Sequence, residues 1–215
     1  MSTPAADSHD AADPLRPLRS FVIGMTRLVE RTGHEPTLLA AGRRLLATLL
    51  ADDRWLPPAY AQADAGVYRQ YLLHCDPLER FSVVSFAWGP GARTPIHDHT
   101  VWGLVGVLRG AESCREYVPQ GAGAVVDTGR EHLMRPGMID AVSPTVGDWH
   151  VVSNADPAGV SVSIHVYGGN IGAVRRHLFD PQADAVRAFV SGYSAPTAPN
   201  PWDRSAAVRA AAGLV

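Results

Sequence analysis

The chain has 215 residues, of which 46% are apolar, and a formal net charge of −2 from 19 basic and 21 acidic side chains. This length predicts one domain with additional elements, or at most two small domains, and the apolar fraction supports a sizeable core. The near-neutral charge argues against nucleic acid or an anionic membrane surface as a partner, and no apolar run is long enough to span a membrane.

The N-terminal part of the chain is predicted to be helical. Residues 1–17, rich in Ala, Asp, Ser and Pro, are expected to form a disordered leader without a signal pattern, which predicts a cytoplasmic protein. Apolar residues then recur at helical spacing in 18–31 and again in 37–51. With the loop that follows, residues 18–66 are expected to form a helical cap over one end or edge of a sheet.

From residue 67 onward the pattern changes to short β-type runs separated by Gly, Pro, Asn or Asp. Many short strands at this spacing predict a sandwich or barrel, here over residues 67–180. Residues 173–178 are expected to add a short strand and 182–190 a helical turn, so 181–215 is predicted to be a helix and loop tail. The main runs lie at 67–74, 81–88, 101–108, 112–118, 124–127, 131–134, 138–142, 150–153 and 160–167.

Three histidines are candidate metal ligands. His97 and His99 are two residues apart at the start of an apolar run, so on a strand both imidazoles point to the same face. Two ligands do not hold an ion, and His150 offers the third because it also follows a turn and begins a β-type run. Iron and zinc both accept three imidazoles, so the ligand count alone does not choose between these metals.

The spacing around the first two histidines resembles the first motif of the cupin superfamily. That motif reads Gly, five residues, His-x-His, three or four residues, Glu, six residues, Gly. Its matching positions are Gly91, His97, His99 and Gly110, but Gly103 occupies the place of the glutamate.

The third histidine lies in a segment that resembles the second cupin motif, with Gly147, His150 and Asn154 at the family spacing. The upstream Pro-x-Gly of that motif is imperfect, because Pro144 precedes Gly147 by three residues. The resemblance implies an all-β core with N-terminal helices, folded as a jelly-roll type cupin β-barrel in one structural domain. Cys75 and Cys114 are expected to pack there as small hydrophobic side chains in preference to forming a disulfide.

A further pattern resembles the thiol dioxygenases related to cysteine dioxygenase. Ser163, His165 and Tyr167 alternate along one predicted strand, so they share a face. The family implies that these three form a hydrogen-bonded network beside Fe(2+). It also implies that a small thiol and O2 are the partners, and that both oxygen atoms end on sulfur as a sulfinate. Three neutral imidazoles without a carboxylate suit an anionic ligand such as a thiolate.

Two positions bear on which thiol is used. An arginine that holds the substrate carboxylate in animal enzymes aligns with Gln70, although the adjacent Arg69 would face the other side of the strand. Glutamine here, together with Arg176 nine residues after Tyr167, resembles bacterial 3-mercaptopropionate dioxygenases. Cysteine and mercaptosuccinate remain alternative substrates. Gly103 replaces the cysteine that cross-links the tyrosine in some animal enzymes, so no thioether is expected at Tyr167.

Other functions stay open at this point. A non-catalytic cupin that senses or binds a ligand through its metal is one alternative, and an isomerase or hydrolase using another metal is a second. A homo-oligomer is compatible with the fold. Asp98 is expected to face away from the two histidines beside it and to accept a hydrogen bond. The remaining histidines are expected to be structural or exposed, namely His9, His34, His74, His132 and His177.

Overall fold

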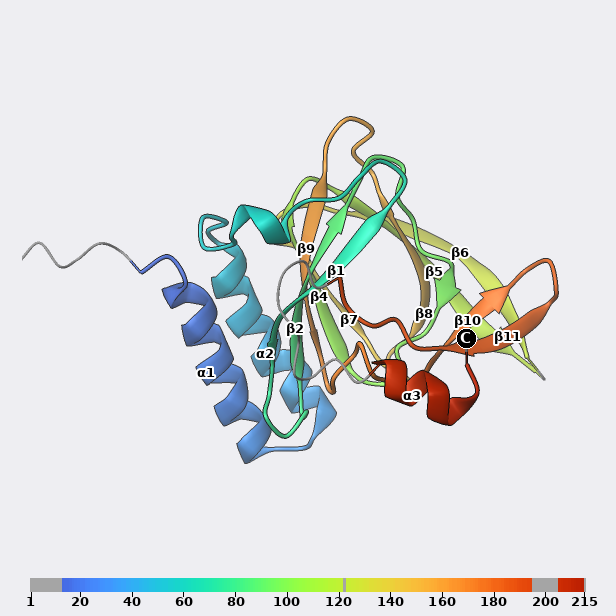
Figure 1. Ribbon diagram of the computed structural model, residues 1–215, viewed down its shortest axis with the longest axis horizontal. Coiled ribbons are helices and arrows are strands. Elements are labelled where there is room, and N and C mark those ends of the chain that lie inside the picture. Colours follow the sequence, from blue (N-terminus) through green and yellow to red (C-terminus); the bar gives the residue numbers. More distant parts are fainter. Residues whose placement is uncertain (1–12, 122, 195–204, 215) are drawn as a thin grey trace, which may run out of the picture.

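The computed structural model describes residues 13–121, 123–194 and 205–214. Two antiparallel β-sheets face each other and form a barrel, and two helices pack on the outside of one sheet (Figure 1). These helices are α1 (Arg16–Arg31) and α2 (Glu35–Leu50). A 3-10 turn, η1 (Pro58–Tyr60), precedes the first strand of the barrel. A third helix, α3 (Ser205–Ala212), comes after the last strand in the sequence.

The strand order identifies the architecture. The five-stranded sheet runs β1-β2-β9-β4-β7 and the six-stranded sheet runs β11-β10-β3-β8-β5-β6, with antiparallel neighbours throughout. The chain crosses repeatedly between the two sheets, which is the jelly-roll arrangement of a cupin double-stranded β-helix. The predicted fold class is therefore confirmed. The first sheet consists of β1 (Tyr68–Cys75), β2 (Ser82–Trp88), β9 (Ser161–Tyr167), β4 (Gly103–Arg109) and β7 (Ile139–Val142). The second consists of β11 (Ala185–Phe189), β10 (Arg176–Asp180), β3 (Ile96–His97), β8 (Trp149–Asn154), β5 (Glu112–Gln120) and β6 (Ala124–Met134).

Strand β9 is buried along its whole length because both faces of its sheet are covered. Its alternate residues Val162, Ile164 and Val166 pack into the core between the sheet and the helices. Tyr167 belongs instead to the second core, between the two sheets. Because strand side chains alternate, the polar residues of β9 share the face that Tyr167 presents to the barrel interior.

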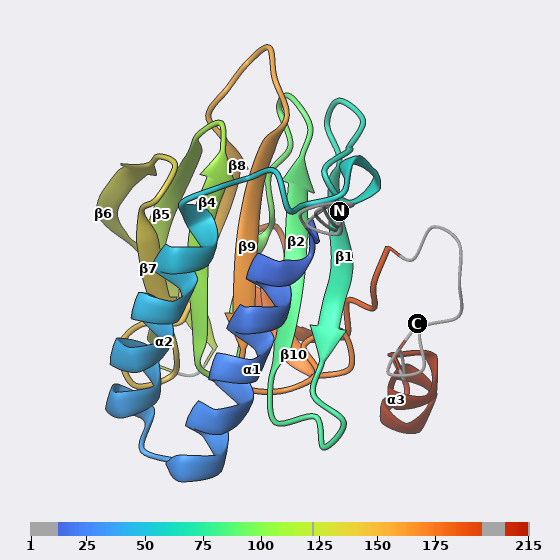
Figure 2. The same ribbon diagram turned by 90° about the vertical axis from the view of Figure 1, so that its left-hand side faces the viewer.

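The two N-terminal helices form the predicted cap, but they lie on a broad face of the five-stranded sheet instead of an end or edge (Figure 2). Side chains of Leu46 and Leu50 reach so close to Gly106 that a Cβ atom there would lie 2.5 Å from Leu50. Helix α1 begins at Arg16, inside the predicted leader, because Pro17 is accommodated in a first helical turn. Residues 1–12 of that leader lie outside the described residues.

The predicted helical turn at 182–190 is wrong, because this segment forms β11 and pairs with β10 in a hairpin. The carboxylate of Asp180 accepts hydrogen bonds from the backbone N–H groups of Gln182 and Ala183, and this turn reverses the chain. The β-structure therefore extends beyond the predicted boundary at residue 180. The strand expected at 173–178 begins later than predicted, as β10 (Arg176–Asp180). Residues 195–204 of the predicted tail lie outside the described residues.

Two smaller observations complete the fold. The runs predicted at 124–127 and 131–134 join into the single strand β6, in which Gly129 has a φ of +74°. A glycine adopts this backbone conformation without steric cost, so the strand continues through the irregularity. No helix among the described residues combines the length and apolar character needed to cross a membrane.

Candidate metal centre

The three predicted histidines meet inside the barrel. His97 ends the short strand β3 and lies directly opposite His150 of β8 in the strand register, while His99 follows two residues later. The ligand atoms of the three imidazoles lie within 4.8 Å of one another, and their ring centroids are 4.8 to 4.9 Å apart. All three side chains are buried. Their convergence, which sequence spacing predicted, forms a group that could hold a metal ion.

The Nδ1 atom of each imidazole contacts a group that is not part of the three-histidine cluster. His97 Nδ1 lies 3.1 Å from the carbonyl oxygen of Pro95, and His99 Nδ1 lies 2.9 Å from Asp148 Oδ1. His150 Nδ1 lies 3.5 Å from Cys114 Sγ. Engagement of Nδ1 leaves Nε2 as the ring nitrogen for a metal, and such outer partners orient metal-binding histidines. The cupin motifs do not predict the contact of Asp148 with His99. The place of Asp148, two residues before His150, could have indicated that it lies near the histidines.

The environment keeps these imidazoles neutral. Burial lowers the pKa of His97 and His99 well below the ordinary value of 6.5, and repulsion from His150 adds to this effect. Burial also lowers the pKa of His150 to about 4. Because a metal binds neutral imidazole, three such nitrogen donors fit a divalent iron or zinc ion.

Ser163, His165 and Tyr167 form the predicted hydrogen-bonded series on β9. Ser163 Oγ lies 2.8 Å from His165 Nε2, and His165 Nδ1 lies 2.7 Å from the Tyr167 hydroxyl. Trp88 extends the series, because its Nε1–H donates to Ser163 Oγ at 3.0 Å. The three β9 side chains are buried, and burial lowers the pKa of His165 well below its ordinary range. A neutral imidazole therefore links two hydroxyl groups.

Tyr167 joins this series to the three histidines. Its ring stacks on His99 with 5.3 Å between centroids and an interplanar angle of 19°. Gly103 is the cross-strand partner of Tyr167, and a Cβ atom at Gly103 would lie 2.7 Å from the tyrosine ring. The glycine in the cupin carboxylate position thus provides the space that Tyr167 occupies, a reason that the sequence motif does not reveal.

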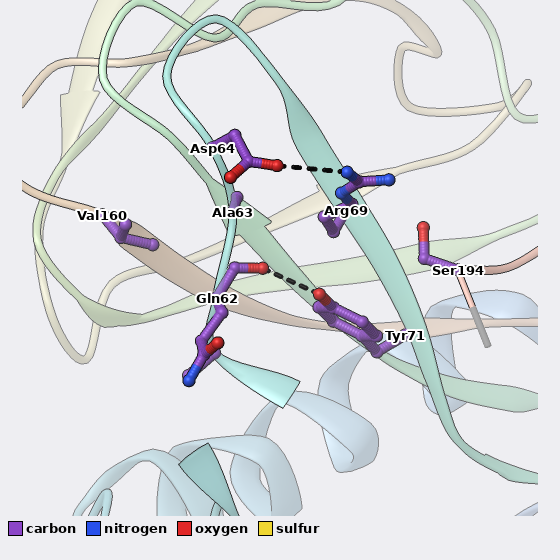
Figure 3. A pocket seen from close by; sticks show the side chains of 8 residues that line it. Gln62, Ala63, Asp64, Arg69, Tyr71, Val160 and Ser194 are labelled. Carbon is purple, nitrogen blue, oxygen red and sulfur yellow. Dashed lines mark hydrogen bonds and ion pairs between the residues drawn. The ribbon is translucent and has the colours of Figure 1, made fainter. Parts of the chain in front are cut away.

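A cavity of about 40 Å³ lies beside the three histidines. Its walls include the three histidines, Tyr167 and both predicted substrate-binding residues, Gln70 and Arg176. Gln70 is buried and its Nε2 donates to the carbonyl oxygen of Gly192 at 2.7 Å. Arg69 faces the other side of β1, into a separate pocket, where its guanidinium contacts Asp64 (Figure 3). Of these two neighbouring residues, Gln70 therefore faces the cavity beside the histidines and Arg69 does not.

Arg176 is a buried cation with neutral partners. Its side chain is 3% exposed, its Nη2 donates to Ser191 Oγ at 2.7 Å, and its guanidinium lies over the Phe189 ring. Its Nε is buried and has no hydrogen-bond partner among the described residues. Asp180, a carboxylate near it in sequence, pairs with Arg187 instead. Burial lowers the pKa of Arg176, and the nearby Tyr167 and Asp98 side chains oppose only part of this shift.

The remaining sequence expectations concern neighbours of the centre. Asp98 points away from the three histidines and its carboxylate accepts from His177, with 2.8 Å between Oδ2 and Nδ1. Both cysteines are buried. Cys114 nevertheless has a polar contact that its expected role as a small hydrophobic side chain does not include, namely the one with His150.

No family model matches the chain. A double-stranded β-helix protein from Klebsiella pneumoniae shares 18% identity, with a TM-score of 0.42 over 56% of this chain and 95% of that one. A cupin 2 domain-containing protein from Halorhodospira halophila shares 16%, with a TM-score of 0.41 over 53% and 70%. The cupin domain of an XRE family transcriptional regulator from Enterobacter cloacae shares 17%, with a TM-score of 0.35 over 46% and 94%. The fold assignment rests on the strand order described above, since similarities this weak carry no argument.

Proposed function

We propose that this protein is an iron-dependent thiol dioxygenase that acts on a small thiol bearing one carboxylate. His97, His99 and His150 would hold Fe(2+), which when bound supplies the site for the thiolate and for O2 activation. In the overall reaction a thiolate and one O2 give a sulfinate, so both oxygen atoms end on sulfur and no external reductant is needed. The preferred substrate in this proposal is 3-mercaptopropionate, which would become 3-sulfinopropionate.

The observation that carries the proposal is the position of Arg176. A buried guanidinium without a carboxylate partner is costly, and an anionic ligand in the same cavity would offset that cost. The cavity that Arg176 lines also contains the three histidines, so one small molecule would reach both with its two ends. A carboxylate at Arg176 and a thiolate at the histidines match these two ends.

The other lining residues support one carboxylate and no ammonium group on the substrate. No Asp or Glu is among the described residues of the cavity wall, so the amino group of cysteine would have no anionic partner. Arg176 is the one arginine or lysine in that described wall, which leaves the second carboxylate of mercaptosuccinate unpaired. A charge buried without a partner is disfavoured, and 3-mercaptopropionate carries neither additional charge.

The hydrogen-bonded series on β9 would direct a proton toward the substrate. Trp88 donates to Ser163 Oγ, and in this proposal Ser163 donates its own proton to His165 Nε2. His165 then donates from Nδ1 to the Tyr167 oxygen, which leaves the phenolic proton of Tyr167 to face the cavity. Burial raises the pKa of Tyr167 above its ordinary value, so the phenol keeps this proton and acts as a donor.

The test is to measure O2 uptake and sulfinate formation by protein loaded with Fe(2+). The thiols 3-mercaptopropionate, cysteine, cysteamine and mercaptosuccinate are compared under matched conditions. We expect the highest kcat/KM with 3-mercaptopropionate and no turnover in zinc-loaded protein, since zinc has no redox chemistry.

The outcomes separate the remaining interpretations. Iron-loaded protein that takes up no O2 with any of the four thiols would overturn the dioxygenase proposal and favour a non-catalytic metal-binding cupin. A clear preference for cysteine would overturn only the substrate assignment. Turnover of a substrate by zinc-loaded protein without oxygen would indicate an isomerase or hydrolase instead.

A further inference from the structure

A second group of metal-ligating side chains lies outside the three-histidine centre. It consists of Cys114 on β5, His132 on β6 and Asp140 on β7, whose ligand atoms all lie within 4.8 Å of one another. Cys114 and His132 are direct cross-strand partners in the six-stranded sheet. Asp140 comes from the opposite sheet, and its Oδ2 lies 2.5 Å from His132 Nε2. The sequence patterns suggested only structural roles for Cys114 and His132.

These three side chains line a second cavity, whose wall also includes His150 of the first centre. It has a volume of about 340 Å³ and its wall includes Glu116 and Arg130. This is far larger than the cavity at Arg176, and it leaves space for water beside the three ligand atoms. His132 and Asp140 are partly exposed, whereas Cys114 is buried at the base of the group. A cation can therefore reach the thiol from solvent past two further ligands.

We propose that Cys114, His132 and Asp140 form a second metal site that takes a borderline-soft divalent cation, with Zn²⁺ as the expected ion. A mixed set of sulfur, nitrogen and oxygen donors suits zinc and disfavours magnesium or calcium, which prefer oxygen ligands alone. Binding would displace the thiol proton of Cys114 to solvent, and water would complete a four-coordinate site.

The charges around the thiol support a cation in this place. The carboxylates of Asp140, Glu116 and Glu112 all act electrostatically on Cys114. Arg130, the one arginine or lysine in the described wall, is paired with Glu116 at 3.2 Å. The local field therefore favours a positive ion. A metal here would also link β5 and β6 to β7 across the two sheets, beside the contact of Cys114 with His150.

The site is tested with Co²⁺ as a spectroscopic substitute for zinc, using the full chain. The triple variant H97A/H99A/H150A removes the first centre, including the His150 imidazole beside Cys114, and leaves Cys114, His132 and Asp140 intact. We expect this variant to bind about one equivalent of Co²⁺ with an absorption band from thiolate coordination, because three protein ligands remain. Adding C114S to it should abolish the band, whereas adding C75S, the matched control at the other cysteine, should not.

A second measurement keeps the proposal testable if a cysteine variant fails to fold. X-ray absorption of zinc-loaded H97A/H99A/H150A should show one sulfur ligand at about 2.3 Å. The proposal is overturned if this protein binds no zinc, or if it binds zinc with nitrogen and oxygen ligands only. Neither readout depends on dioxygenase activity, so the first centre and its proposed chemistry stand or fall separately.

Discussion

Arg176 places a positive charge inside the protein next to an aromatic ring and a serine hydroxyl. The guanidinium carbon lies 4.7 Å from the centroid of Phe189, so the packing of the side chain is partly apolar. The Ser191 hydroxyl that accepts from Arg176 also accepts from Gln70, at 3.2 Å. These shared contacts hold the charge at one position in the cavity, where a substrate carboxylate would meet a preorganised partner.

Replacing Arg176 by Met should therefore weaken carboxylate binding while keeping the packing against Phe189. A hydrogen bond to a charged group contributes roughly 1.5 to 3 kcal/mol, so we expect KM for 3-mercaptopropionate to rise roughly 10- to 100-fold. Turnover of cysteamine, which has no carboxylate, should not fall. The control is Arg175→Met, at an exposed neighbour. Equal losses for both thiols in steady-state kinetics would contradict carboxylate binding by Arg176.

Gly103 is a second residue whose role depends on contact with one side chain. The Cβ of an alanine there would lie 2.7 Å from the Tyr167 ring and 2.9 Å from Val142, closer than real contacts allow. Gly103→Ala should displace Tyr167 and lower the free energy of unfolding by about 1 to 3 kcal/mol, as overpacking does. Urea denaturation measures this loss. Gly33→Ala is the control because no atom lies within 4 Å of its added Cβ, and an equal loss there would refute the steric explanation.

At the scale of elements, α2 stabilises the barrel from outside without contributing to the cavity. Leu46 is fully buried between α2 and the five-stranded sheet, whereas the cavity lies on the opposite face of that sheet and is also lined by residues of the six-stranded sheet. Leu46→Ala should lower the free energy of unfolding by about 2 to 5 kcal/mol, because it opens a cavity in the core. Metal content per folded molecule should stay unchanged. Thr48→Ala, exposed on the same helix, should leave stability almost unaltered, and a loss of metal in Leu46→Ala alone would show that the cap also shapes the centre.

The sequence predicts those parts of the site that depend on strand periodicity. His97 and His99 share one strand face, and Ser163, His165 and Tyr167 share another, because side chains alternate along strands. Which of the adjacent residues Arg69 and Gln70 faces the cavity depends on the register of β1. That register depends on the pairing of β1 with β2 and therefore on distant sequence.

Contacts made by tertiary packing were not predictable in this way. Segment 185–189 forms a strand because it pairs with β10, and that pairing overrides the local preference suggested by its sequence. The same hairpin brings Ser191 to Arg176, so a wrong secondary structure also hid a residue of the cavity. Asp148 and the cluster around Cys114 likewise depend on which strands become neighbours.

At the scale of the whole molecule, the two sheets are linked by a buried polar contact as well as by apolar packing. Glu112 on β5 is fully buried and its Oε1 accepts from the Ser161 hydroxyl of β9 at 2.9 Å. Its Oε2 has no hydrogen-bond partner in the part of the chain that the structure describes. Burial raises the pKa of Glu112 from its ordinary value of 4.5 to about 7, while the hydrogen bond from Ser161 opposes the shift. The folded protein therefore keeps a protonated carboxyl group between its sheets under mildly acidic conditions.

This shift makes the stability of the fold depend on pH with a definite sign. Between pH 4.5 and about 7 the unfolded chain has lost the Glu112 proton while the folded chain retains it, so the folded state is progressively destabilised as pH rises. The variant Glu112→Gln has no titratable proton at this position, so its stability does not depend on this ionisation. The unfolding free energy of the natural chain, relative to the variant, should therefore fall by at most about 3 kcal/mol across this window and level off above it. Urea denaturation of both proteins at several pH values, with metal removed, measures the difference. Parallel pH profiles would show that Glu112 titrates normally and that the link between the sheets is already ionised at pH 5.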